Sequence, residues 1–396
     1  MGLRLNALFS YGFRPFFLMA GLYGAFVIVP WVLQFLGSSI PGDFPWSMIA
    51  ASPVEWHAHE MLFGYISAVI AGFFLTAVPS WTGARPVSGG SLMVLSGLWL
   101  AGRLVIWFSA LLPGVLVASV DVLFFPVLVA LVIRALIAGW SVRNFIFLPV
   151  MAGMCIANVL MHLEWLGITQ ATLQIGQRLA IDLVVLLIII LGGRVIPAFT
   201  TNALRKKGEE KLPLQSVTLT RLALLSVVAM TVVDVVAPQS QLSGMLAATA
   251  AFVNFIRMSS WRMHRTFDQP IVWVLFMGFG FIVLGLALQS MAILGGSIER
   301  NVADHLLTIG GAGGMTVAVM SRAALGHTGR ALHAPWPIVG TYVLIAASAL
   351  LRASAPVFFA QHYILLISIA GTLWVLAFVL FCWVFWPILT TPRPRP

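Results

Sequence analysis

Residues 55–60, with the sequence EWHAHE, hold two imidazoles and two carboxylates directly before a long apolar run at residues 61–78. Imidazole is the commonest side-chain ligand of transition metals, and a nearby carboxylate commonly orients it. The apolar run is long enough to cross a membrane, where ionisable groups are costly and usually functional. This pattern indicates a site for metal or proton chemistry at the start of a membrane span.

The composition of the 396-residue chain is that of a membrane protein. Hydrophobic residues make up 60% of it and charged residues only 9%, whereas soluble domains carry about 25% charged residues. These polar groups are too few to cover a water-exposed surface, so we expect a single integral membrane domain over residues 1–396. Cys155 and Cys382 both lie in apolar runs, which favours buried thiols over a disulfide framework.

Twelve apolar runs are long enough to cross a bilayer, which takes about 20 residues. They predict an all-α membrane protein, a bundle of twelve transmembrane helices. Spans two, six and ten each begin with ionisable residues, and this faint repeat suggests three four-helix units. The predicted spans cover residues 14–36, 58–79, 91–112, 115–138, 145–166, 174–198, 217–237, 243–261, 271–294, 303–324, 335–353 and 361–387.

The basic residues are distributed unevenly between the two ends of these spans. Most of the 22 Lys and Arg side chains fall at one set of ends, whereas Arg178, Arg300 and Arg352 fall at the opposite ends. Because cytoplasmic loops are enriched in Lys and Arg, we expect both termini in the cytoplasm. The net charge of +10 is then a topology signal that faces anionic lipid, and it does not indicate nucleic-acid binding.

This topology places four histidines at similar depth in the outer half of the membrane. His57 and His59 begin span two, His162 ends span five and His305 begins span ten, and we expect these four to be metal ligands. Residues two apart on a regular helix point about 200° apart. His57 and His59 can therefore share one ion only where the chain is extended, and otherwise they face two neighbours, for instance two metal centres.

The same histidines also have structural interpretations that the sequence leaves open. His162 could pair with Glu164 at the membrane interface, and His305 could pair with Asp304. The two histidines of span two could belong to an interfacial polar cluster. His362 is expected at the surface.

Span ten continues past His305 into a glycine-rich stretch, GGAGG at residues 310–314. Small residues let either a second helix or a flat macrocycle approach the backbone closely. Helix packing and a haem face are both open interpretations. In the second case Gly310, Gly311 and Gly314 are the residues expected to contact the cofactor.

Two ionisable residues inside predicted spans need partners, because an isolated charge is costly in the membrane. Asp182 in span six could pair with a metal-bound histidine or with Arg178. Arg103 in span three needs an anion, which could be a haem propionate or Asp121. Glu60 and Asp182 are the candidate proton carriers.

A second polar set gathers at the predicted cytoplasmic ends of the spans. It fits either positive-inside anchoring or a pocket for an anion or a cofactor. His327 belongs to this set and lies about 30 Å along one helix from His305, so it cannot join the outer histidines. The set comprises Trp81, Arg85, Arg194, Asn202, Arg322, His327 and Arg330.

The sequence resembles the NnrS family in segments spread over nearly the whole chain. The resemblance implies a twelve-span protein of the bacterial inner membrane that contains haem and copper. It also implies a role in denitrification or in resistance to nitric oxide. It transfers no metal ligands, so the histidines above rest on topology and spacing alone. The matching segments are GFRPFF at residues 12–17, WHAHEMLFG at 56–64, AGF at 71–73, WTG at 81–83, GGRVIPAFT at 192–200, MSR at 320–322 and LGHTGR at 325–330.

The twelve-span plan with histidines in the outer half is also similar to the catalytic subunits of haem–copper oxidases and nitric oxide reductases. The chain departs from their pattern, because span six offers Asp182 where they have a histidine and span seven offers no histidine. This likeness is one of architecture only.

Three functions fit these observations. The first is a redox or binding protein for nitric oxide, with haem b among spans two, five and ten and copper close by. Such a protein could be an oxidoreductase, and it would need an electron donor that the sequence does not identify. The second is a transporter of copper or another small solute. The third is a cytochrome b-like electron carrier.

Overall fold

The computed structural model describes residues 2–36, 46–296 and 298–394, and within these ranges the chain forms helices and connecting loops but no β-strand. Twelve of the described helical segments are long and apolar enough to cross a membrane. The chain is therefore a multi-pass, all-helical membrane protein, as its composition predicts. The segments are Phe13–Phe35, Pro53–Thr82, Gly90–Trp107, Gly114–Ala138, Phe147–Trp165, Thr172–Lys206, Val217–Val236, Gln241–Arg265, Pro270–Ile293, Arg300–His327, Trp336–Phe358 and Ala360–Thr390.

The predicted spans match these segments one for one, and the differences lie at their ends. The largest is in the sixth segment, Thr172–Lys206, whose helix continues eight residues beyond the predicted end at residue 198. The added stretch contains Ala, Leu, Arg and Lys, which are good helix formers. Its last turn carries Arg205 and Lys206, whose charges are favourable at a helix C-terminus.

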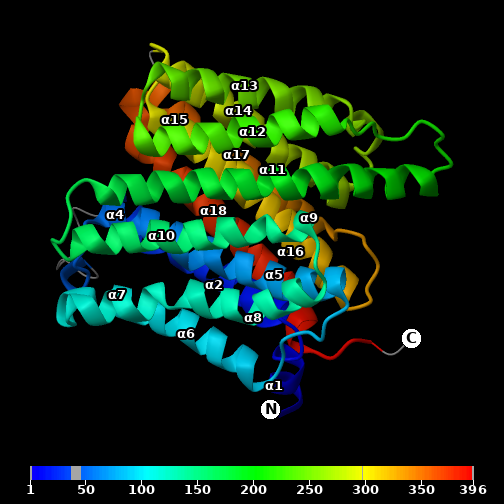
Figure 1. Cartoon of the computed structure of the whole chain (residues 1–396), viewed down its shortest axis with the longest axis horizontal. Helices are drawn as coiled ribbons and strands as arrows, with labels where there is room; N and C mark the ends of the chain where they lie inside the picture. The colour runs from blue at the N-terminus through cyan, green and yellow to red at the C-terminus, as the bar shows by residue number, and fades with distance from the viewer. Residues whose placement is uncertain (1, 37–45, 297, 395–396) are drawn as a thin grey trace. The chain divides into compact units, whose positions relative to one another are not determined.

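The chain divides into two compact units, and this division does not follow the four-span repeat. Unit 1 comprises Met1–Ala180, Ala323–Arg330 and Phe378–Pro396, and unit 2 comprises Ile181–Arg322 and Ala331–Ala377. Three helices belong partly to each unit, namely α11 (Thr172–Lys206), α16 (Gly314–His327) and α18 (Tyr363–Thr390) (Figure 1).

The remaining helices belong to one unit each. Those of unit 1 are α1 (Gly2–Leu8), α2 (Phe13–Phe26), α3 (Ile28–Leu36), η1 (Trp46–Met48), α4 (Pro53–His59), η2 (Glu60–Ile66), α5 (Ser67–Thr82), α6 (Gly90–Trp107), η3 (Ser109–Leu111), α7 (Gly114–Val122), α8 (Phe124–Ala138), α9 (Val142–Phe145) and α10 (Phe147–Trp165). Those of unit 2 are α12 (Val217–Val236), α13 (Gln241–Ser259), η4 (Met263–Arg265), α14 (Pro270–Ile293), α15 (Arg300–His305), η5 (Leu306–Gly313), α17 (Trp336–Phe358) and η6 (Ala360–His362).

Helix α4, which carries the EWHAHE segment, begins with a capping box. The backbone N–H of Glu55 lies 3.4 Å from Ser52 Oγ, and the backbone N–H of Ser52 donates to Glu55 Oε2 over 3.1 Å. Pro53 occupies the first turn, where its missing N–H costs nothing. These local signals set the point at which span two begins.

Span two changes its helical form directly after His59. The α-helix ends there and the π-helix η2 follows, before α5 resumes the regular form. A π-helix usually marks an extra residue within an α-helix and often occurs at a functional site.

Small residues hold span two tightly against α2. A Cβ atom on Gly12 would lie 2.3 Å from Leu75 Cβ, and one on Gly72 would lie 2.6 Å from the ring of Phe17. Without a hydrophobic effect inside a bilayer, such close packing is a main source of helix association. The close approach of α2 and α5 therefore fixes the α5 part of span two, the span that also carries His57 and His59.

The glycine-rich stretch of span ten is a helix-packing surface. A Cβ atom on Gly310 would lie 2.4 Å from the ring of Phe281, and one on Gly311 would lie 2.3 Å from the side chain of Ile282. A Cβ atom on Gly314 would lie 3.1 Å from the backbone of α14. Side chains of α14 therefore fill the space beside these glycines, which leaves no face for a haem there.

Candidate metal centre

Five segments of unit 1 bring polar side chains together in a buried cluster. His59 is the last residue of α4 and Glu60 is the first residue of η2. Arg103 comes from α6, Asp121 from α7, and Asn158 and His162 from α10. We call His59, Glu60, Arg103, Asp121, Asn158 and His162 the buried polar cluster.

Asp121 is the hub of this cluster. Its Oδ2 atom lies 3.1 Å from His59 Nε2 and 3.0 Å from His162 Nε2, and it accepts a hydrogen bond of 2.8 Å from Asn158 Nδ2. Its Oδ1 atom accepts from Arg103 Nη2. One carboxylate thus joins groups from three other helices.

Glu60 forms a second junction beside the first. Its Oε1 atom accepts from Arg103 Nη1 over 2.5 Å and lies 2.9 Å from His59 Nδ1. Its Oε2 atom accepts from the hydroxyl of Tyr23, which in turn accepts from Trp107 Nε1 over 3.2 Å. Arg103 therefore links the two carboxylates, which explains how its charge is tolerated inside a membrane span.

The cluster is sealed from solvent, and its formal charges do not balance. His59 and Glu60 are 0% exposed, Asp121 is 2% exposed, and Arg103 and His162 are also buried. With both imidazoles neutral, the set carries two negative charges and one positive charge. A net charge of this kind is very costly in a low-dielectric interior. One further positive charge is needed, either a proton or a metal ion.

The contacts of His59 show where this additional positive charge is needed. Its Nδ1 atom faces Glu60 Oε1, and its Nε2 atom faces both Asp121 Oδ2 and Asn158 Oδ1, at 3.1 and 3.0 Å. All three are oxygen acceptors, so a neutral imidazole cannot satisfy both sides. Either His59 is an imidazolium, or Nε2 binds a cation while Nδ1 donates to Glu60.

The arrangement has the donor set of a metal site. One ligand atom each from His59, Asp121 and His162 lies within 4.8 Å of the others, and all three residues are buried. Two imidazoles and one carboxylate suit copper, iron or zinc. Glu60 and Asn158 occupy the positions of outer partners that orient the ligands.

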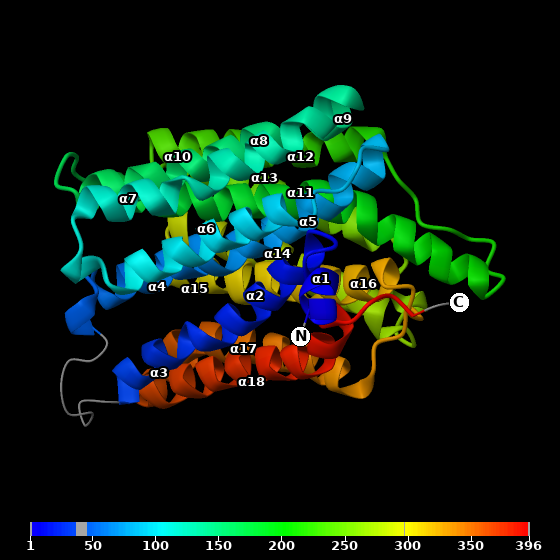
Figure 2. The same cartoon turned by 90° about the horizontal axis from the view of Figure 1, so that it is seen from below.

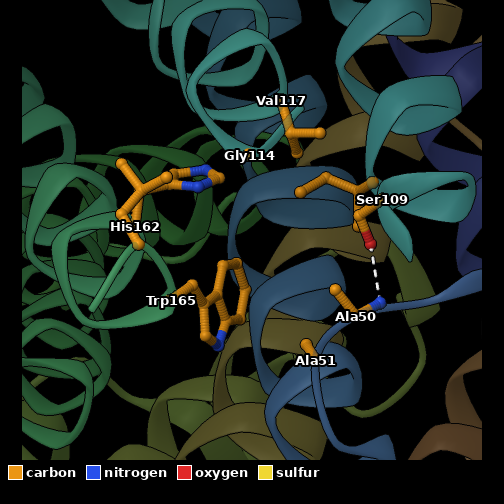
Figure 3. A pocket seen from close by; sticks show the side chains of 9 residues that line it. Ala50, Ala51, Ser109, Gly114, Val117, His162 and Trp165 are labelled. Carbon is orange, nitrogen blue, oxygen red and sulfur yellow. Dashed lines mark hydrogen bonds between the residues drawn. The ribbon is translucent and has the colours of Figure 1, made fainter. Parts of the chain in front are cut away.

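A small cavity opens beside His162 (Figure 3). Its volume is about 90 Å³, and it reaches the loops that join the ends of several helices. The hydrogen bond from the backbone N–H of Ala50 to Ser109 Oγ, 2.9 Å long, closes one side of it. The cavity is mostly apolar and fits a few water molecules or a diatomic molecule. It is lined by Ala50, Ala51, Ile106, Ser109, Gly114, Val117, His162, Trp165 and Leu166.

The buried polar cluster does not fit a haem. The ring of His59 is surrounded by those of Phe63, His162 and Trp165, with centroids 5.1, 5.5 and 5.1 Å away. Pockets for drug-sized or larger ligands have volumes of about 300–1,000 Å³, far above the 90 Å³ beside His162. The donors fit a single ion, and the surrounding rings leave no slot for a macrocycle.

The structure brings together some of the predicted site residues and separates others. His59, His162, Glu60 and Arg103 meet in the buried polar cluster, and the anions that Arg103 needs are Glu60 and Asp121. His57 lies on a different face of α4 and stacks on Trp31, with centroids 4.4 Å apart and planes 8° apart. Helix geometry predicted this divergence of the two histidines.

Two predicted residues belong to unit 2 and not to this cluster. The Nδ1 atom of His305 lies 2.7 Å from the backbone oxygen of Asn301. Asp182 is buried on α11, close enough to Arg300 for their charges to interact.

The prediction missed Asn158 and Tyr23. Asn158 precedes His162 by four residues, which places both side chains on one face of α10. That spacing was a usable signal. Tyr23 sits in an apolar helix with no local sign that its hydroxyl meets Glu60, because only the packing of α2 against span two creates this contact.

A buried donor set of two histidines and a carboxylate, inside a twelve-span helical chain, defines a membrane protein with a candidate metal centre. The family model described as NnrS protein matches residues 7–393, and the chain belongs to the NnrS family. No curated protein matches it. Membership of this family suggests a membrane protein connected with nitric oxide.

Proposed function

We propose that this chain is a copper protein of the bacterial inner membrane that binds, and could reduce, nitric oxide at the buried polar cluster. The observation that carries the proposal is the convergence of His59, Asp121 and His162, whose ligand atoms lie within 4.8 Å of one another. The family connection with nitric oxide supports the choice of ligand.

Copper is favoured among the candidate metals by charge. The cluster lacks one positive charge when its imidazoles are neutral, and a cuprous ion supplies it. Bound copper would offer nitric oxide a coordination position and a one-electron couple. An electron donor is then required, and its identity is open.

The protein side chains position and protect this centre. Asp121 Oδ2 holds the Nε2 atoms of both histidines at 3.0–3.1 Å. Glu60 accepts at His59 Nδ1 and so directs His59 Nε2 toward Asp121. Arg103 neutralises one of the two carboxylates, which lowers the cost of burying them.

Glu60 and Tyr23 can hold a proton near the histidines. The hydroxyl of Tyr23 donates to Glu60 Oε2, and Glu60 Oε1 lies beside His59 Nδ1. A proton at Glu60 therefore stands one hydrogen bond from a ligating imidazole. The cavity beside His162 provides space for a small, uncharged molecule and excludes larger ones.

The test measures metals in the full-length protein purified in a mild detergent. We expect stoichiometric copper in the unaltered protein, strong depletion in His59→Gln and His162→Gln, and full copper in His333→Gln. His333 is an exposed histidine outside the cluster and serves as the matched control. Because cuprous copper has no electron paramagnetic resonance signal of its own, nitric oxide should produce a new signal in the unaltered protein and in the control.

Other outcomes separate the competing functions. Copper retained in both cluster variants would contradict the assignment of the site. Copper that is indifferent to nitric oxide, with protein-dependent copper uptake into vesicles, would favour a transporter. A haem Soret band that persists in His59→Gln and His162→Gln would indicate a haem held elsewhere, as the lack of space at this cluster requires.

A further inference from the structure

A second group of charged side chains lies outside the metal centre, where three segments of unit 1 meet. Arg14 is in the first turn of α2, Arg330 follows α16, and Arg393 lies in the C-terminal stretch, which passes close to α1 (Figure 2). We call Arg14, Arg330 and Arg393 the arginine cluster. Arg14 and Arg330 belong to the GFRPFF and LGHTGR segments, which the metal centre does not use.

Ring contacts hold these two segments together. The ring of His327 stacks on Tyr11, with centroids 5.7 Å apart and planes 25° apart, and lies equally close to Phe13. The conspicuous histidine of the LGHTGR segment is therefore a packing residue. It fixes the following residues of the segment at the start of α2.

Gly329 lets two of the arginines come close together. Its φ of +71° is in the left-handed region, and a Cβ atom there would lie 2.5 Å from Arg393 Nε. A side chain at this position would strain the turn and displace the guanidinium. Glycine thus allows Arg393 to lie against the backbone directly beside Arg330.

Arg14 is the third member of the arginine cluster. It is 4% exposed, and its Nη1 atom donates to the backbone oxygens of Leu389 and Thr391 over 2.9 and 2.7 Å. Leu389 lies in the last turn of α18 and Thr391 directly follows the helix, so the helix dipole offsets part of the charge. Arg330 lies close enough for its charge to act on Arg14.

The arginine cluster has positive charges without an ion-pair partner and one hydrogen-bond donor without an acceptor among the described residues. In the described part of the chain, no carboxylate forms an ion pair with Arg14, Arg330 or Arg393. The Arg330 side chain is partly exposed, but its Nη1 atom is buried and has no hydrogen-bond partner among the described residues. A buried, unsatisfied donor on a cation is costly, and so is the approach of like charges. One anion placed at Arg330 would remove both costs.

We propose that the arginine cluster binds a phosphate group. Guanidinium groups match phosphate oxygens in geometry and form charge-assisted hydrogen bonds with them. The cluster lies at the ends of spans that the charge distribution predicts to be cytoplasmic. The phosphate can therefore come from the headgroup of an anionic lipid or from free phosphate in solution. This site is independent of the metal centre and of the proposed function.

The experiment compares the thermal unfolding of delipidated protein in a neutral detergent with three additions, namely phosphatidylglycerol, phosphatidylcholine and inorganic phosphate. The variants are Arg330→Gln and Arg393→Gln. The control is Arg205→Gln, which removes an exposed arginine outside the cluster. Monodisperse elution and an unchanged far-ultraviolet circular dichroism spectrum show that each variant is folded.

We expect phosphatidylglycerol to raise the unfolding temperature of the unaltered protein and of Arg205→Gln, and phosphatidylcholine to raise neither. The concentration of phosphatidylglycerol that gives half of the full rise in unfolding temperature should be about tenfold to a hundredfold higher in Arg330→Gln and Arg393→Gln. This is the effect expected for the loss of one charge-assisted hydrogen bond. An equal effect of inorganic phosphate would identify free phosphate as the ligand. Failure of both phosphates to stabilise the unaltered protein, or equal stabilisation of all variants, would overturn the proposal.

Discussion

Replacing Asp121 with asparagine tests whether one carboxylate holds the metal centre together. Asparagine keeps the shape of the side chain and removes its charge. Its single oxygen can face either Arg103 or the two histidines, His59 and His162. In one orientation the new NH₂ group faces the donor of Arg103, and in the other it faces the donor of Asn158. At least one hydrogen bond that Asp121 accepts in the unaltered protein is therefore lost.

The size of the effect follows from the contacts of Arg103. Removing one partner of a buried ion pair usually costs about 3–5 kcal/mol. Arg103 keeps Glu60 as a second partner, so we expect the lower end, about 3 kcal/mol. If the loss of a ligand charge weakens copper binding by the same amount, the affinity falls about a hundredfold, since each 1.4 kcal/mol is a factor of ten.

The assay is a competition for cuprous ion between the purified protein and a coloured chelator. The matched control is Asp234→Asn in unit 2, where the carboxylate is 1% exposed and accepts hydrogen bonds from Arg300 and Ser243. This control also loses a buried ion pair but should bind copper normally. Unchanged affinity in Asp121→Asn, or equal copper loss in both variants, would refute the reasoning.

Three further changes test neighbouring features. Asn158→Leu removes the amide that orients the hub carboxylate, so copper affinity in the same competition should fall about 10- to 100-fold, and no change would show that this amide has no such role. Val117→Trp fills the small cavity and should slow the association of nitric oxide in stopped-flow mixing without loss of copper; an unchanged rate would mean that the ligand enters elsewhere. Gly311→Val forces a branched side chain against Ile282, and we expect a lower thermal unfolding midpoint with unchanged copper content, whereas an unchanged midpoint would contradict the tight packing.

The spans were predictable because hydropathy is a local property of the sequence. Each of the twelve apolar runs became a membrane-length helix, and the errors occurred where polar residues such as those before Lys206 continue a helix beyond the apolar run. Helix geometry alone also separated His57 from His59, because residues two apart cannot share a face.

The contents of the buried polar cluster were only partly predictable. His59 and His162 were named as ligands from their depth, and Asp121 was named only as one of two partners for Arg103. Which faces of α4, α7 and α10 meet depends on how the helices pack, and no local pattern encodes it. The charge of Arg103 gave the best signal, since a buried guanidinium must find carboxylates nearby.

The π-helix after His59 makes the centre sensitive to the length of the chain. An extra residue in a helix rotates everything on one side of it by about 100° relative to the other side. Deleting Met61 alone should therefore restore a regular helix, keep α5 in its packing against α2, and turn His59 and Glu60 away from Asp121. The deletion of one residue would thus leave a protein that still inserts into the membrane but no longer has the metal centre. A second π-helix, η5, begins directly after His305, so span ten has the same dependence on a single residue.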